Sequence, residues 1–410
     1  MIYRYALKCK TCEQPHTVRI GLGLDSSQTH KFPCRSCDEE IVLRMDIDQV
    51  KHGWRVECVD NCEPILEIVG APIVNVDANF LIPADRQGMD VAFWRFDQIE
   101  AMYEASKRVM PSRVCVTVSP TDPSHRPYRP PDYAEEWRLL RRAWSLARNG
   151  RTELSEMLIE KASAEFYPPE HSIDNLSNWV WRLATFLCNP SYEPVFDAAM
   201  KAMEPLNDSI LLWDFRQFYK TEAPERGPRY FTIMADFFTA YSEFSQVYFF
   251  VSKGLEIPHN YHTTSTDFDT VKMFYGNAYE HFTTLIDFLA LLNNMLAGRR
   301  YDIFLTLTLD EYRKLDRSAR FRSFMDNIPF AAICAEANNQ IRNASHHSAL
   351  VFNQARQTIS YRSGKGSTGP EQSISYADYL VRCVKIFLQT MTLFRIELLI
   401  ANLLEVRHPI

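Results

Sequence analysis

The stretch "STDFDTVKMFYGNAYEHFTTLIDFLALLNNMLAGRR", residues 265–300, decides the expected fold class of this chain. Its apolar residues recur every three or four positions, at Val271, Phe274, Ala278, Phe282, Leu285, Phe288, Leu289, Leu292 and Leu296. Because this spacing places them on one face, it predicts a long amphipathic helix. Gly298, followed by two arginines, is typical of the end of such a helix.

Three further helices are expected downstream. Thr308 and Glu311 fit a capping box for the second. Pro329 suits the first turn of a third, "PFAAICAEANNQIRNASHHSALVFNQARQ", residues 329–357. Ser375 and Asp378 fit a capping box before a fourth, which contains "YLVRCVKIFLQTMTLFRIELLIANLLE". Four helices joined by polar connections predict a helical bundle over residues 259–410.

The chain before this bundle divides into three expected segments. Helical spacing in "EEWRLLRRAWSLARNG" and later stretches predicts a helical middle region over residues 135–258. Residues 71–134 look extended and end in "PTDPSHRPYRPPDY", a proline-rich linker. Residues 1–70 contain strand-like patterns and six of the ten cysteines. We therefore expect a mainly α protein with a small N-terminal β domain.

Cysteine spacing predicts a metal site in that N-terminal domain. Two Cys-x2-Cys pairs are separated by 21 residues, which suits four thiolates around one tetrahedral Zn²⁺ in a zinc ribbon. The predicted structural ligands are Cys9, Cys12, Cys34 and Cys37. A further Cys-x3-Cys pair, Cys58 and Cys62, is either an incomplete second site or a substitute ligand pair.

Composition limits the classes of function. The net charge of −6 predicts no broad cationic surface, so any nucleic-acid site should be local. The longest apolar runs, such as "LIDFLALL", are much shorter than the roughly 20 residues of a membrane span. The first residues lack the apolar core of a signal peptide. We expect a soluble, cytoplasmic protein without a membrane partner.

One polar stretch of the third helix stands out, "QIRNASHHSAL", residues 340–350. Arg342 and His347 form the only Arg-x4-His pair in the chain, and Asn343 follows the arginine. Together with "ISYRSGKG" and "SISYADYLVRC" downstream, this R-N-x3-H motif resembles the HEPN superfamily of bacterial and archaeal ribonucleases. The resemblance covers roughly residues 260–410.

The resemblance implies a metal-independent endoribonuclease whose domains pair, so that two motifs meet in one composite site. The RNA 2′-hydroxyl would attack the adjacent phosphate, which leaves a 2′,3′-cyclic phosphate and a 5′-hydroxyl. Arg342 would bind the phosphate, His347 would act as acid and base, and Asn343 would orient them. These residue types suit that chemistry, because histidine exchanges protons near neutral pH and guanidinium stabilises phosphate charge.

Helix geometry makes a second histidine, His346, an alternative candidate for the acid/base role. His347 lies about 140° around a straight helix from Arg342, whereas His346 shares its face. His346 and Glu280 are therefore further catalytic candidates, and Lys365 is a candidate RNA contact. By resemblance the expected role is a toxin or antiphage effector, a homodimer controlled by a regulatory ligand or a phage-derived trigger. The alternative is a non-catalytic scaffold that binds RNA or protein.

Overall fold

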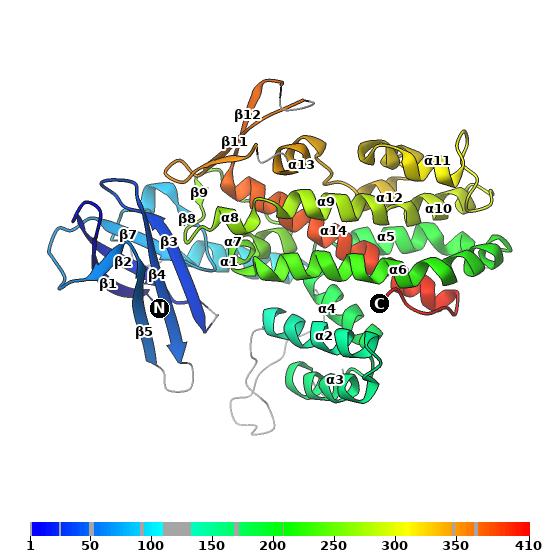
Figure 1. Ribbon diagram of the computed structural model, residues 1–410, viewed down its shortest axis with the longest axis horizontal. Helices are drawn as coiled ribbons and strands as arrows, with labels where there is room; N and C mark the ends of the chain where they lie inside the picture. Colours follow the sequence, from blue (N-terminus) through cyan, green and yellow to red (C-terminus); the bar gives the residue numbers. More distant parts are fainter. Residues whose placement is uncertain are drawn as a thin grey trace. The chain divides into compact units, whose positions relative to one another are not determined.

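The computed structural model describes residues 2–23, 26–48, 53–90, 94–109, 133–167, 172–207, 209–346, 349–364 and 368–410. Over these residues the protein is mainly α-helical, as the sequence predicts, with several small β-sheets (Figure 1). The chain divides into two compact units, each assembled from three segments. The first unit comprises Met1–Cys115, Ala240–Tyr275 and Gln340–Val384, and the second comprises Val116–Thr239, Gly276–Asn339 and Lys385–Ile410.

The first unit begins with a β-sandwich. One sheet has the order β6-β1-β2-β7, built from β6 (Cys62–Pro64), β1 (Ile2–Cys9), β2 (Pro15–Gly21) and β7 (Ile73–Asp77). The other has the order β3-β4-β5, built from β3 (Ser27–Pro33), β4 (Glu40–Asp48) and β5 (Gly53–Asp60). Leu7, Ile20, Leu43 and Val74 belong to one buried cluster between them. Side chains alternate across each strand, so each sheet can give one face to this core.

The same unit contains short helices and two smaller sheets. These are β8 (Ile82–Pro83) with β9 (Tyr261–His262), the sheet β10 (Val351–Asn353), β11 (Thr358–Arg362) and β12 (Glu371–Ser375), and the helices α1 (Phe96–Val109), α7 (Tyr241–Ser252), α8 (Phe268–Val271) and α13 (Asn339–His346). Buried hydrogen bonds attach segment 261–267 to the sandwich. The Thr264 hydroxyl accepts the Asp77 N–H at 2.9 Å, and Ser265 Oγ lies 2.6 Å from His30 Nδ1.

The second unit is helical. It contains α2 (Tyr133–Arg148), α3 (Thr152–Phe166), α4 (Leu176–Cys188), α5 (Glu193–Met203), α6 (Leu211–Thr239), most of α9 (Phe274–Leu285), α10 (Asp287–Leu296), α11 (Leu309–Lys314), α12 (Ile328–Ile333) and most of α14 (Tyr376–Leu403). Long α6 packs on α14 through stacked rings, with Phe237 and Phe387 centroids 3.6 Å apart and Tyr230 and Phe394 centroids 4.1 Å apart.

An ion cluster is buried in this helical core. Glu397 of α14 accepts hydrogen bonds from Arg226 at 2.5 and 2.7 Å, from Tyr219 at 2.9 Å and from Tyr230 at 2.6 Å. Arg226 also contacts Asp287 at 2.7 Å. Each charge is therefore paired inside the core, which is the condition under which charged groups are tolerated there.

Local structure differs from the sequence prediction in three places. Residues 329–357 do not form one helix: α12 ends at Ile333, α13 spans only eight residues, and the chain then enters β10 and β11. The long helix expected from residue 265 is divided into α8, α9 and α10. Residues 96–109, expected to be extended, form α1. The third helix is shorter than the sequence predicts, because apolar spacing alone does not distinguish "VFN", residues 351–353, as a strand.

Several predicted signals are confirmed. Thr308 and Glu311 form the capping box of α11, and Ser375 Oγ accepts the Asp378 N–H at 3.0 Å at the start of α14. Gly298 has a positive φ of 73° after α10. Most of the expected linker at 120–133 lies outside the described residues. The four expected segments, 1–70, 71–134, 135–258 and 259–410, stay predictions and do not coincide with the two discontinuous units.

Candidate functional site

The four cysteines predicted as metal ligands come together at one end of the β-sandwich. Their sulfur atoms all lie within 4.8 Å of one another. The Cys12 and Cys34 sulfurs are 3.5 Å apart, and those of Cys9 and Cys37 are 3.9 Å apart. A tetrahedral zinc with Zn–S bonds of about 2.3 Å needs sulfurs roughly 3.8 Å apart. The cluster is therefore compatible with one structural zinc ion.

The two cysteine pairs adopt the same backbone conformation. The Cys9 N–H donates to Gln14 O at 3.0 Å, and the Cys34 N–H donates to Glu39 O at 2.9 Å. The N–H of Glu13 donates to Cys9 O, and the N–H of Asp38 donates to Cys34 O. Glu13 and Asp38 both have a φ near +60°. Each left-handed residue reverses the chain after its second cysteine. The two turns thus aim four sulfurs at one point.

Hydrogen bonding and burial affect the thiols differently. The backbone N–H of Gln14 lowers the pKa of Cys12 to about 7. Burial raises the pKa of Cys34. Because a metal binds the thiolate form, ion binding would release protons from this cluster.

Asn61 and His16 support the cluster without belonging to it. Asn61 Oδ1 accepts the Thr11 N–H at 3.1 Å and the Thr11 hydroxyl at 2.9 Å, while its Nδ2 donates to Glu40 O at 2.9 Å. His16 Nδ1 lies 3.0 Å from Gln14 O, and its Nε2 accepts the Arg35 N–H at 3.2 Å. Both side chains therefore fix the turns that hold the cysteines. Sequence reasoning missed Asn61, because contacts between distant turns leave no spacing signal.

Cys58 and Cys62 do not join the four-sulfur cluster. The Cys58 sulfur lies 3.8 Å from the Tyr5 hydroxyl, and Cys62 contacts Val42 O at 3.5 Å. Burial raises the pKa of Cys62 to about 12, so it remains a neutral thiol at physiological pH. Among the described residues, the pair therefore behaves as packing within the sandwich.

The motif helix α13 lies in the first unit. Ile341 and Ala344 are buried on one side, while Arg342, Asn343 and His346 are half-buried. Ser345 Oγ donates to Lys272 O at 2.6 Å, and the Tyr379 hydroxyl donates to that same carbonyl at 3.0 Å. Ser345 thus has a structural role within the motif, because it fixes α13 to the end of α8 beside α14.

Three of the predicted catalytic residues, Arg342, Asn343 and His346, lie on α13. Arg342 Nη1 donates to Asn343 Oδ1 at 2.8 Å, so the two side chains lie side by side. His346 Nε2 is buried and has no hydrogen-bond partner among the described residues. The Gly364 N–H donates to Gln340 Oε1 at 2.8 Å, which holds the start of the following loop against this helix.

The remaining candidates are distributed elsewhere. His347 and Lys365 lie outside the described residues. Glu280 belongs to α9 in the second unit, where it accepts a hydrogen bond from Arg317 Nε at 3.1 Å. This ion pair gives Glu280 a structural role of its own, and its catalytic role stays a prediction.

A buried carboxylate in the first unit was not anticipated. Glu243 of α7 accepts a hydrogen bond from the Tyr376 hydroxyl at 2.9 Å, and burial raises its pKa to about 7. His30 is fully buried, which lowers its pKa to about 4 and keeps the ring neutral. Glu243 and His30 form polar contacts within the sandwich and the adjacent helices, so we assign them a structural role.

No helix within the described ranges combines the length and apolar character needed to cross a bilayer. Comparison of the chain with protein-family models, with curated proteins and with solved structures found no match.

Proposed function

We propose that the protein is a metal-independent endoribonuclease of HEPN type. The observation that carries this proposal is the pair of residues that begins the R-N-x3-H motif on α13, where the guanidinium of Arg342 and the amide of Asn343 lie side by side in half-buried positions. A guanidinium held by a neighbouring amide is suited to a phosphate group. A small, local phosphate site of this kind agrees with the net charge of −6, because a negatively charged protein has no general attraction for nucleic acid.

In the proposed reaction the RNA supplies its own nucleophile. His347 removes the proton of the 2′-hydroxyl or donates one to the leaving 5′-oxygen, and His346 is the second candidate for either task. Arg342 stabilises the charge that develops on the phosphate oxygens, and Asn343 orients the guanidinium. DNA should resist cleavage because it lacks the 2′-hydroxyl.

Assembly and cellular role form part of the same proposal. The resemblance to HEPN ribonucleases favours a homodimer through residues 259–410, with one composite site for two motifs. It also favours a cytoplasmic toxin or antiphage effector under the control of a ligand or phage-derived trigger. Sedimentation that finds a fully active monomer at micromolar concentration would contradict the dimer.

The N-terminal cysteines have a separate proposed role. Four thiolates fill a tetrahedral shell and leave no open position for a substrate. We therefore assign Zn²⁺ to Cys9, Cys12, Cys34 and Cys37 as a structural ion of the β-sandwich, and no metal to the cleavage reaction.

The direct test incubates purified protein with labelled RNA in the presence of EDTA. We expect cleavage products with 2′,3′-cyclic phosphate ends from the wild type, and none from Arg342→Ala. Arg356→Ala is the matched control, because Arg356 is an exposed arginine in the turn before β11.

Two results would favour other conclusions. An RNA mobility shift without cleavage by the wild type would support the non-catalytic scaffold instead. Equal cleavage by wild type and Arg342→Ala would indicate a contaminating nuclease or a different site, and would refute the assignment of α13.

A further inference from the structure

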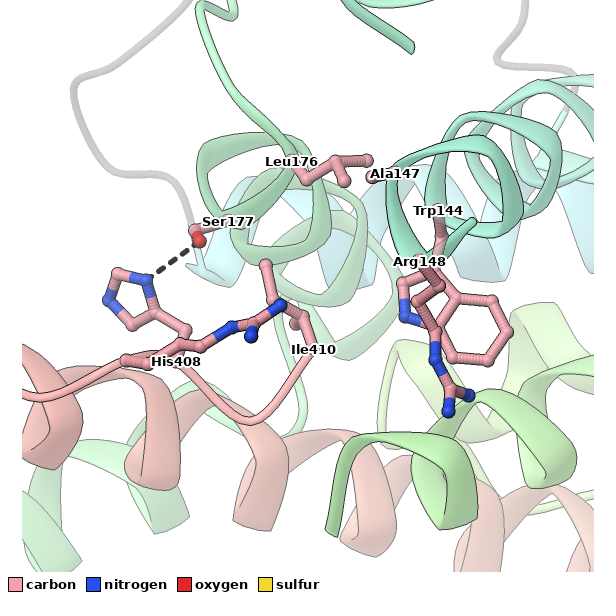
Figure 2. Close-up of a pocket in the computed structure, with 8 residues that line it drawn as sticks. Trp144, Ala147, Arg148, Leu176, Ser177, His408 and Ile410 are labelled. Carbon is pink, nitrogen blue, oxygen red and sulfur yellow. Dashed lines mark hydrogen bonds between the residues drawn. The ribbon is translucent and has the colours of Figure 1, made fainter. Parts of the chain in front are cut away.

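The second unit contains a cavity of about 260 Å³ that the proposed ribonuclease chemistry does not use. Figure 2 shows Trp144, Ala147 and Arg148 of α2 across from Leu176 and Ser177 of α4 and from His408 and Ile410 of the last segment. Arg407 completes the lining. The wall therefore combines apolar surface with two guanidinium groups.

The charges around this cavity are unbalanced. Its lining contains Arg148 and Arg407, both exposed, and no acidic side chain, and neither arginine forms an ion pair with a described acidic side chain. Asp174 lies nearby in the chain, yet its carboxylate accepts hydrogen bonds from the amides of Asn175 and Asn178. Two guanidinium groups without an acidic side-chain partner at one cavity favour a negatively charged occupant.

The other polar groups are already held in place. His408 Nε2 must donate to Asn402 Oδ1 at 2.7 Å, so His408 Nδ1 accepts the hydrogen bond from the Ser177 hydroxyl at 2.7 Å. Burial lowers the pKa of His408, which agrees with a neutral ring. The imidazole therefore fixes one wall of the cavity and leaves recognition of charge to the arginines.

The aromatic wall is equally rigid. The Trp144 ring stacks on Phe231 with centroids 4.1 Å apart, and the Arg148 guanidinium lies 4.9 Å from the centre of the Trp144 ring. Trp144 Nε1 is buried without a hydrogen-bond partner among the described residues. A cation held over an aromatic face loses less freedom on binding an anion than a mobile side chain would.

The last segment is fixed by a close backbone approach. A Cβ added at Gly227 of α6 would lie 2.8 Å from Pro409 O and 2.9 Å from Ile410 Cα. Only a residue without a side chain allows these two backbones to approach so closely. The wall formed by 407–410 is therefore preformed, which reduces the free-energy cost of binding.

We propose that this cavity binds a small ligand that carries a phosphate or carboxylate group on an apolar or aromatic body. Arg148 and Arg407 bind the oxyanion, and Leu176, Ala147 and Ile410 contact the body of the ligand. This combination of apolar lining with a few charged groups is typical of small-molecule sites. The proposal does not depend on the ribonuclease function.

Isothermal titration calorimetry at constant ionic strength tests the site on the full-length protein. The probes are phenyl phosphate, benzoate, inorganic phosphate and benzylamine, which separate the oxyanion, the aromatic body and the sign of the charge. We expect phenyl phosphate to bind more tightly than inorganic phosphate, and benzylamine not to bind. The ratio between phenyl phosphate and benzoate identifies which oxyanion the site prefers.

Variants locate the binding. Arg148→Ala and Arg407→Ala should each weaken phenyl phosphate binding about tenfold or more, since each removes a charge-assisted contact. Arg151→Ala is the matched control, because Arg151 is exposed like Arg148 and Arg407 but lies outside the lining. Circular dichroism checks the fold of every variant. Absence of binding by both aromatic anions, equal binding of benzylamine, or wild-type affinity in both folded arginine variants would overturn the proposal.

Discussion

The side-chain oxygen of Asn61 accepts the backbone N–H of Thr11 at 3.1 Å, and this contact joins β5 and β6 to the turn of the first cysteine pair. The Asn61 amide also donates to Glu40 O beyond the second pair. One asparagine thus holds both cysteine turns. Residues outside a metal's ligand shell commonly affect affinity through such contacts.

Asn61→Ala should lower zinc affinity roughly ten- to hundredfold, because both turns lose the group that orients them. Competition with a chromophoric chelator measures the change. Asn260→Ala is the control, since Asn260 is exposed in the same unit. Unchanged affinity in the Asn61 variant would show that the cysteine turns are held by their own backbone hydrogen bonds.

Replacement of single cysteines should distinguish ligands from packing residues. Cys34→Ser should lose one equivalent of zinc and unfold the sandwich, because a structural ion contributes its binding free energy to folding. Cys58→Ser should retain the ion, since Cys58 contacts Tyr5 rather than the four-sulfur cluster. Elemental analysis gives the stoichiometry, and zinc loss from Cys58→Ser would add Cys58 to the site.

Glu243 should make the first unit less stable as pH rises. Burial raises its pKa from 4.5 to about 7 in the folded protein, so the unfolded chain binds fewer protons between these values. The contribution to stability is full below pH 4.5 and falls by up to about 3 kcal/mol as pH approaches 7. The titratable groups that face this carboxyl are those of Lys31, Asp267 and Tyr376, and a substitution at Glu243 alone leaves them in place.

Glu243→Gln should therefore remove most of this pH dependence. Hydrogen exchange of peptides from α7, measured from pH 5 to pH 8, gives the free energy of local opening. Exposed Glu256→Gln is the control and should follow the wild type. If wild type and Glu243→Gln change in parallel with pH, the carboxyl is ionised in the folded protein.

Loss of one partner of the Arg226–Glu397 pair should destabilise the helical unit. Glu397→Gln leaves a buried guanidinium without its full countercharge and weakens contacts to Tyr219 and Tyr230. Loss of one partner of a buried ion pair costs about 3–5 kcal/mol. Urea denaturation should show an earlier transition, whereas Glu405→Gln, which changes an exposed partner of Arg216, should leave the midpoint unchanged.

Some features were predictable because local chemistry determines them. The two Cys-x2-Cys pairs predicted the sulfur cluster, since thiolate spacing reflects a metal's geometry. Thr308 and Glu311 predicted a helix start, because a capping box involves residues only three positions apart. Asn61 and Glu243 were not predictable, because their importance comes from partners far away in the sequence.

The region after α13 shows a different limit. Residues 351–362 follow a helical motif without a strong break, yet they form β10 and β11 because they pair with each other and with β12. Such pairing is a tertiary effect that can override local spacing. The motif residues Arg342 and Asn343 were found from the sequence, but the anchoring role of Ser345 required the structure.

The last prediction separates the two adjacent histidines. His346 is the final residue of α13, one helical turn after Arg342, whereas the R-N-x3-H resemblance assigns catalysis to His347. His347→Ala should reduce cleavage roughly 10²–10⁴-fold, the usual loss when a general acid or base is removed. Asn343→Ala should cost roughly ten- to hundredfold, because an orienting hydrogen bond contributes about 1–3 kcal/mol.

Single-turnover cleavage of a labelled RNA by Arg342→Ala, Asn343→Ala, His346→Ala and His347→Ala measures these differences. Because a neutral histidine contributes little ground-state binding, His347→Ala should bind RNA better than Arg342→Ala does. His346→Ala should retain most activity if it only flanks the site. An inactive His346→Ala beside an active His347→Ala would transfer catalysis to the histidine that shares the helix face of Arg342. Normal cleavage by all four folded variants would leave α13 as a polar helix without catalytic function.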